Sequence, residues 1–170
     1  MLKVGAVSFG SFDERQNKAL PVGLTADRRH EVRVGDFLMS RANTTELVGA
    51  CAIVLKTRPK LLLSDKIFRF HFRGQVSPEW LDYVLKSPAL REQISREASG
   101  TSPTMKNISK EKVLSLLVPP HSPDEQRDVV SKLRDLGSRV DSLKKDQAET
   151  AEELDALLPA ILDRAFLGEL

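Results

Sequence analysis

The sequence has few of the residues from which disulfides, metal sites and catalytic sites are built. Cys51 is the single cysteine, which excludes an internal disulfide and an all-cysteine metal site. A lone cysteine fits a reducing compartment such as the cytoplasm, where it is usually a buried structural thiol. The three histidines, His30, His71 and His121, lack the spacing of metal ligands. The sequence therefore predicts neither a metal site nor a bound cofactor.

Several longer patterns are also missing. No apolar run approaches the length of a membrane span, and no cleavable signal pattern opens the chain. The sequence lacks a glycine-rich phosphate loop, a paired-carboxylate motif and a histidine near the cysteine. We therefore expect no membrane partner and no catalytic activity from this chain itself.

The net charge of +2 conceals an uneven distribution. Residues 1–120 carry 19 Lys and Arg against 12 Asp and Glu, whereas residues 121–170 carry 7 against 12. A basic segment followed by an acidic one suggests that the basic part meets a polyanion. Ordinary solvated surface charge is the alternative that charge alone leaves open.

The last third of the chain has the pattern of one long helix. Ser122 can cap its first turn, Pro123 suits the first helical position, and Glu125 can bond back to the cap. Apolar residues then recur in three- and four-residue steps, the spacing of a coiled-coil seam. A helix running to Phe166 would be roughly 65 Å long and would need a second helix against it. The predicted dimerisation residues on this seam are Val129, Leu133, Leu136, Val140, Leu143, Leu154, Leu157 and Ile161.

Three polar or helix-breaking residues interrupt this seam. Gln147 and Thr150 lie near its middle, where an antiparallel second copy could bring the same polar residues together and fix the register. Pro159 removes a backbone donor and is expected to kink the helix around residues 156–160, turning residues 161–166 toward another surface. We expect a homodimer through this helix. The alternative is a monomer whose helix folds back on its own body.

Residues 1–120 read as an α+β domain with strands first and helices later. Apolar runs predict strands near residues 4–9, within 30–40, over 48–55 and over 67–72.

In the second half of this domain, helix signals replace the strand-like apolar runs. Ser77-Pro78 and Ser87-Pro88 each look like a helix cap followed by proline at the first helical position. Residues 99–109, rich in glycine, serine, threonine and proline, read as a loop.

Phe68, Phe70 and Phe72 fall on one face of the last predicted strand. Such rings could stack on nucleotide bases, but aromatic residues on one side of a strand usually belong to the core. We favour the core interpretation.

Two polar loops, residues 40–45 and residues 100–107, combine Arg, Lys, Asn, Ser and Thr with little bulk. Such side chains can bond phosphates and base edges, with Arg and Lys suited to guanine and Asn to adenine. On composition alone they could equally be solvated loops. The candidate DNA-binding residues are Ser40, Arg41, Asn43, Thr44, Thr101, Ser102, Thr104, Lys106 and Asn107.

Three stretches together resemble the specificity subunits of type I restriction–modification systems. The first is VGDFLMSRAN at 34–43, followed by LVG at 47–49. The second is ASGTSPTMKNIS at 98–109, leading through LVPP to DEQR. The third is LLPAILDRAF at 157–166, ending in GEL. Their order and spacing cover nearly the whole chain.

The resemblance implies a function in DNA recognition. Such subunits hold target-recognition domains that each read half of a split site in double-stranded DNA, with long helices acting as a ruler between them. They are not catalytic themselves. They bind modification subunits, which methylate adenine with S-adenosylmethionine, and the assembly recruits a restriction subunit that cuts DNA.

The sequence departs from that pattern in having one domain and one long helix instead of two of each. We expect residues 1–120 to be a recognition domain that lacks its N-terminal part, and residues 121–170 to be the spacer and dimerisation helix. A two-fold dimer would restore the usual layout with identical ends, which implies a palindromic split target. The alternative is a truncated assembly or regulatory protein that pairs through its helix without binding DNA.

Overall fold

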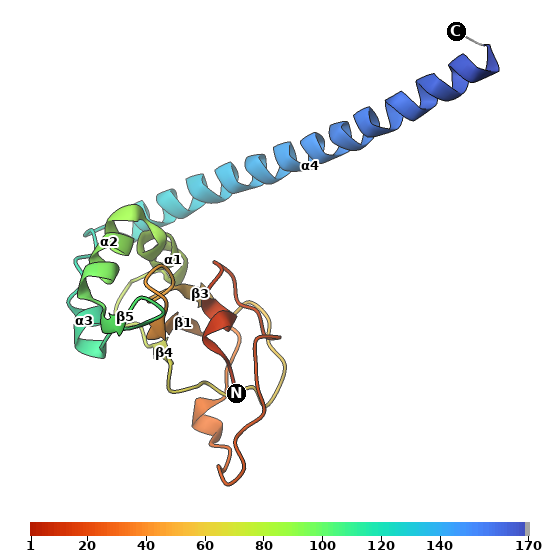
Figure 1. Cartoon of the computed structure of the whole chain (residues 1–170). Coiled ribbons are helices and arrows are strands. Elements are labelled where there is room, and N and C mark those ends of the chain that lie inside the picture. The colour runs from red at the N-terminus through yellow and green to blue at the C-terminus, as the bar shows by residue number, and fades with distance from the viewer. Residues whose placement is uncertain (169–170) are drawn as a thin grey trace. The chain divides into compact units, whose positions relative to one another are not determined.

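The computed structural model describes residues 1–168 (Figure 1). The chain divides into two units, Met1–Arg127 and Asp128–Leu170. The first unit, here called the body, contains the strands and the short helices, which is the α+β composition that the sequence predicts. The helices are α1 (Pro78–Lys86), α2 (Pro88–Glu97), α3 (Lys110–Leu114) and α4 (Pro123–Leu167). The strands are β1 (Phe37–Ser40), β2 (Ala42–Asn43), β3 (Cys51–Ile53), β4 (Ile67–Phe70), β5 (Ser99–Ser102) and β6 (Met105–Asn107).

The core of the body is built on an antiparallel sheet with the order β3-β1-β4. The central strand β1 is buried at every position, so its run of apolar side chains serves both faces of the sheet. Phe37 lies opposite Ile53 on β3 and Phe70 on β4. Leu38 and Leu61 are fully buried in the adjoining apolar cluster. Burial of this strand therefore fixes the position of the chain that leaves it at Ser40.

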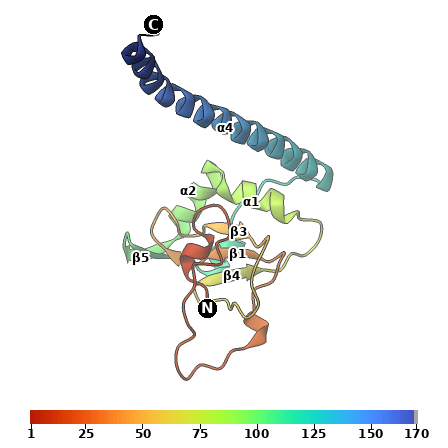
Figure 2. The ribbon, with the colours of Figure 1, turned by 90° about the vertical axis from the view of Figure 1, so that its right-hand side faces the viewer.

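Both short helices begin at the predicted Ser-Pro pairs. The Ser77 hydroxyl accepts a hydrogen bond from the Trp80 N–H at 3.3 Å, and the Ser87 hydroxyl accepts one from the Leu90 N–H at 3.5 Å. Each proline occupies the first turn, where no intrahelical donor is lost. α1 packs beside β3, as Figure 2 shows. α1 therefore covers the sheet at β3, and α2 packs against α1.

One prediction about a short segment is wrong, and another gives a strand that is too long. Val4–Val7 forms a 3-10 helix instead of a strand, with Ala6 and Val7 both buried, so consecutive side chains point inward where a strand would alternate them. The strand predicted at 48–55 is present but shorter, as β3 (Cys51–Ile53). Gly49 turns the chain just before it with a φ of 72°.

The prediction of a loop at residues 99–109 is also wrong. β5 and β6 form an antiparallel hairpin with an irregular register between Ser99 and Ser102. The hairpin has few residues with strong strand preference, so its pairing depends on the neighbouring strand β2 and not on local propensity.

α4 starts with the predicted capping box. The Ser122 N–H donates to the Glu125 carboxylate at 2.7 Å, and the Glu125 N–H donates to the Ser122 hydroxyl at 3.3 Å. These bonds hold the pKa of Glu125 below its usual value. The helix continues through Pro159 to Leu167, and the kink expected at this proline stays a prediction. No helix within residues 1–168 is both long and apolar enough to cross a membrane.

The first turn of α4 belongs to the body and is tied to it by a buried amide. Gln126 is 5% exposed, and its Oε1 accepts a hydrogen bond from the Ser77 N–H at 2.8 Å. Its Nε2 donates to the His121 carbonyl at 2.9 Å. One side chain thus joins the start of α1 to the start of α4.

Candidate nucleic-acid interface

A second small sheet, with the order β2-β6-β5, joins the two polar stretches. β2 pairs antiparallel with β6, which sets Ala42 opposite Asn107 and Asn43 opposite Lys106. The Ile108 N–H donates to the Arg41 carbonyl at 2.9 Å and extends the pairing by one more bond. Residues far apart in the sequence therefore form one surface, which we call the paired-loop surface (residues 41–45 and 99–107).

Thr45, which is in the first polar loop but not among the candidate DNA-binding residues, holds the tip of the hairpin. Its backbone N–H and its hydroxyl both donate to the Pro103 carbonyl, at 3.0 and 3.2 Å. Thr104 and Met105 beside this carbonyl are exposed. The tip is thus held by backbone-directed bonds while its side chains remain accessible.

Gly100 allows the two hairpin strands to approach closely. It has a φ of 139°, and a Cβ atom built on it would lie 2.5 Å from the Met105 carbonyl oxygen. The Lys106 ammonium donates to the Gly100 carbonyl at 2.7 Å across the same gap. A larger residue at position 100 would therefore force β5 and β6 apart.

Not all of the candidate DNA-binding side chains face outward. Ser40 is fully buried, and its hydroxyl donates to the Leu47 carbonyl at 2.9 Å. The Asn43 amide donates to the Ser8 hydroxyl at 2.9 Å, and its oxygen accepts from the Thr44 N–H at 2.9 Å. Because these groups are already bonded within the body, Ser40 and Asn43 hold the loop in shape.

Arg41 is the exposed cation of the first loop. Its guanidinium lies over the Phe68 ring, 5.5 Å from the ring centroid, within the range of a cation–π contact. Phe70 and Phe72 pack against the buried Phe37 ring, at centroid distances of 5.2 and 5.7 Å. The three phenylalanines are half-buried, so they contribute to the core while part of each ring stays accessible.

The hairpin presents a row of hydroxyl and amide groups. Thr101 is exposed, and the Ser102 and Thr104 hydroxyls lie 2.8 Å apart in a hydrogen bond. Lys106 and Asn107 are half-buried on the strand that pairs with β2. Beside Arg41, these groups give a mixed set of donors and acceptors without a carboxylate, which suits an anionic polymer.

The chemistry of Cys51 does not suit catalysis. The thiol is buried and donates to the Asp82 carboxylate at 3.6 Å. Burial, aided by the negative charge of Asp82, raises the pKa of the Cys51 thiol to about 12. The thiol therefore stays protonated near neutral pH and is a poor nucleophile. Within residues 1–168, no three His, Cys, Asp or Glu side chains are grouped to hold a metal ion.

Comparison with protein-family models finds no match. Comparison with characterised proteins finds the type I restriction enzyme EcoEI specificity subunit of Escherichia coli, 32% identical over 98% of this chain. The type I restriction enzyme EcoKI specificity subunit of Escherichia coli strain K12 is 29% identical over all of this chain. The chain belongs to the type I restriction enzyme specificity-subunit family. It spans 28% and 37% of the lengths of these two relatives, about a third.

The alignment with the specificity subunits includes both halves of the paired-loop surface and the long helix. Of the predicted seam residues, Val129 and Leu133 are half-buried. The others are exposed: Leu136, Val140, Leu143, Leu154, Leu157 and Ile161. Leucines at Leu158, Leu162 and Leu167 and the ring of Phe166 are exposed as well. The long helix of this chain therefore has apolar side chains that are mostly exposed within its own unit.

Proposed function

We propose that this chain is a DNA sequence-recognition component of a type I restriction–modification complex, without catalytic activity of its own. It would direct the methyltransferase subunit, and through the complex the restriction subunit, to a split target in double-stranded DNA in the cytoplasm. The observation that carries the proposal is the pairing of β2 with β6. This pairing gathers separate polar stretches of a specificity-subunit relative into one surface.

The residues of the paired-loop surface have different roles in this proposal. Arg41 reads a base, because its guanidinium offers a rigid fork of donors that matches guanine and is oriented by Phe68. Lys106 holds phosphate, because an ammonium acts as a point charge without base preference. Ser40 and Asn43 keep the loop in place from inside. The remaining direct contacts are assigned to Thr44, Thr101, Ser102, Thr104 and Asn107.

The test is DNA binding by the chain assembled with its methyltransferase subunit. Arg41→Ala should weaken the preferred sequence by about 5- to 150-fold while leaving other sequences nearly unchanged. Lys106→Ala should weaken all sequences and reduce the slope of affinity against salt concentration by about one unit. Methylation-site mapping in cells that express both proteins identifies the sequence to use.

Matched controls lie at the far end of the first sheet. Arg33 and Lys56 are both exposed, and both lie beyond the end of the Phe37–Ile53 pair that is distant from Ser40. Arg33→Ala and Lys56→Ala should therefore leave sequence preference intact. If Arg41→Ala and Lys106→Ala behave like these controls, the assignment of the interface is wrong.

The proposal includes a homodimer through α4, most simply antiparallel. Its support is the exposed apolar seam along a helix of 45 residues, which needs a second helix to leave water. An isologous dimer would present two identical recognition bodies, so the split target would be palindromic. Light scattering on the purified chain should give twice the monomer mass. Leu136→Glu with Val140→Glu should give the monomer, and a monomeric wild type would refute the dimer.

A further inference from the structure

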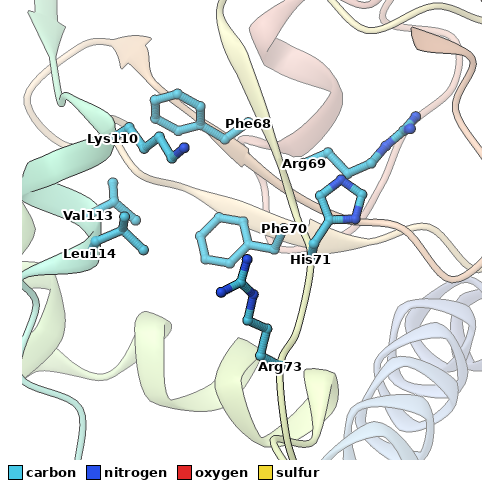
Figure 3. Close-up of a pocket in the computed structure, with 8 residues that line it drawn as sticks. All are labelled: Phe68, Arg69, Phe70, His71, Arg73, Lys110, Val113 and Leu114. Carbon is cyan, nitrogen blue, oxygen red and sulfur yellow. The ribbon is translucent and has the colours of Figure 1, made fainter. Parts of the chain in front are cut away.

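A cavity of about 610 Å³ lies between β4 and α3 in the body (Figure 3). Phe68 and Phe70 project into it from one side of β4, and Val113 and Leu114 face them from α3. Both phenylalanines are half-buried, and Leu114 is 74% exposed. The cavity is therefore an open pocket with apolar walls, in the size range of small-molecule sites.

The charge around this pocket has one sign. Arg73 and Lys110 line it and both are exposed; Figure 3 shows the Arg73 guanidinium beside the Phe70 ring and the Lys110 side chain beside the Phe68 ring. Neither forms an ion pair within residues 1–168, whereas Arg69 is engaged with Asp36 at 3.1 Å. Among the described residues, no Asp or Glu lines the pocket. Two cations beside aromatic and aliphatic walls suit a ligand that is flat and apolar at one end and anionic at the other.

The separation of Phe68 and Phe70 along β4 further limits which ligands fit the pocket. Side chains two residues apart on a strand are separated by about 6.7 Å, roughly twice the 3.4 Å rise between successive bases in DNA. A base can stack on the accessible part of either ring, since both phenylalanines are half-buried. Base stacking on aromatic side chains together with cationic contacts to the backbone is the usual mode of single-strand binding.

The pocket also adjoins the paired-loop surface. The Arg41 guanidinium lies over the Phe68 ring that forms one wall. Lys110 follows Ile108 closely along the chain, and the Ile108 N–H bonds the Arg41 carbonyl at 2.9 Å. DNA bound at the paired-loop surface would thus pass the mouth of the pocket.

We propose that this pocket binds one unstacked nucleotide of DNA, with the base against Phe68 and Phe70 and its phosphate between Lys110 and Arg73. The proposal rests on the DNA-recognition function above and adds a second mode of contact to it. The base is held by stacking instead of by hydrogen bonds to its edges, so the pocket tolerates any base. An apolar acidic protein segment is the competing occupant, and the test below distinguishes it.

The experiment measures fluorescence anisotropy of a labelled oligothymidylate and of a labelled duplex with the full chain. Wild-type protein should bind both. Phe68→Leu keeps apolar bulk but removes a ring, and it should weaken the single strand about tenfold. Lys110→Gln, at an exposed position that cannot unfold the body, should weaken it and lower its salt slope by about one unit. Phe9→Leu and Lys56→Gln are controls at exposed positions outside the pocket.

The outcomes separate this proposal from the proposed function. Duplex binding that responds to Lys106→Ala, without any single-strand binding, would overturn the pocket and leave the function standing. Single-strand binding that is unchanged by both Phe68→Leu and Lys110→Gln would also overturn the pocket proposal. A protein segment would then be the occupant to test. Displacement of the oligonucleotide by an equal concentration of thymidine monophosphate would reassign the pocket to free nucleotides. Loss of single-strand binding in both pocket variants, but not in the controls, supports the proposal. It does so even if Arg41→Ala leaves duplex recognition unchanged.

Discussion

The body and the long helix place their apolar side chains in opposite environments. In the body, Leu2, Leu38 and Leu61 have no exposed surface. Along α4, Leu143 and Leu154 are 60% and 62% exposed although they follow the same regular spacing that predicts a buried stripe. The body therefore has the contacts to fold by itself, whereas the helix has the pattern of a surface that another helix must cover.

A pair of leucine substitutions tests this difference most strongly. Leu38→Ala opens a cavity in the core and should lower the free energy of unfolding by about 2–5 kcal/mol. Leu154→Ala should lower the unfolding free energy of the body by less than about 0.5 kcal/mol, because Leu154 belongs to the other unit and any burial of it in a dimer affects association instead. Urea unfolding followed by the fluorescence of Trp80, the only tryptophan, reports on the body. Equal losses for the two variants would contradict the comparison.

The hairpin of the body provides the next test. Gly100→Ala places a methyl group against the Met105 carbonyl and should cost about 1–3 kcal/mol of unfolding free energy, with loss of DNA binding. Gly74→Ala is the matched control, since Gly74 also has a positive φ of 80° but nothing within 4 Å of the added atom. Light scattering should show an unchanged mass for both variants. A change of mass in Gly100→Ala alone would mean that the hairpin, and not only α4, takes part in association.

The junction between α1 and α4 sharpens the comparison where the body meets the start of the helix. Gln126→Ala leaves the Ser77 N–H without its acceptor and should lower the free energy of unfolding by about 1–3 kcal/mol. Arg127→Ala, at the exposed neighbouring position, removes only a surface ion pair with Asp124 and should have little effect. Thermal unfolding by circular dichroism compares the two. A harmless Gln126→Ala would show that the first turn of α4 is not fastened to the body by this amide.

The smallest expected effect is a dependence on acid pH in the body. Side-chain and backbone bonds from Arg29 lower the pKa of Asp27 from 3.8 to about 2. A lowered pKa in the folded state means that the stabilisation is present above about pH 4 and disappears as the pH falls toward 2. Asp27→Asn should abolish this small part of the pH dependence of unfolding. An unchanged acid profile in Asp27→Asn would show that the Arg29 contacts do not stabilise the body.

Local signals in the sequence predict the helices well and the hairpin poorly. The starts of α1, α2 and α4 are confirmed because a cap and a proline act within one turn of the chain. The strands β5 and β6 could not be predicted, because their partner β2 is distant in sequence and their own residues favour turns.

The candidate interface shows the same limit. Composition selected each polar loop, but it could not show that the two pair with each other. It also could not distinguish Ser40 and Asn43, whose polar groups are bonded inside the body, from the exposed Arg41. A serine or asparagine has the same letter in either environment, and only the packing of the surrounding chain decides. Lys110 and Arg73 went unnoticed because their pocket forms from two separate elements.

The position of β4 at the outer edge of its sheet also affects how the protein behaves at high concentration. An outer strand presents unpaired backbone groups, which can template the stacking of further strands into aggregates. Here the exposed Lys66 and Arg73 flank the strand, so two copies approaching edge to edge would bring like charges together. At an ionic strength of about 0.1–0.15 M, salt largely screens such repulsion beyond about 8–10 Å. Storage at moderate ionic strength, below the pI of about 8.7, should therefore keep the purified chain dispersed, and added salt should promote precipitation.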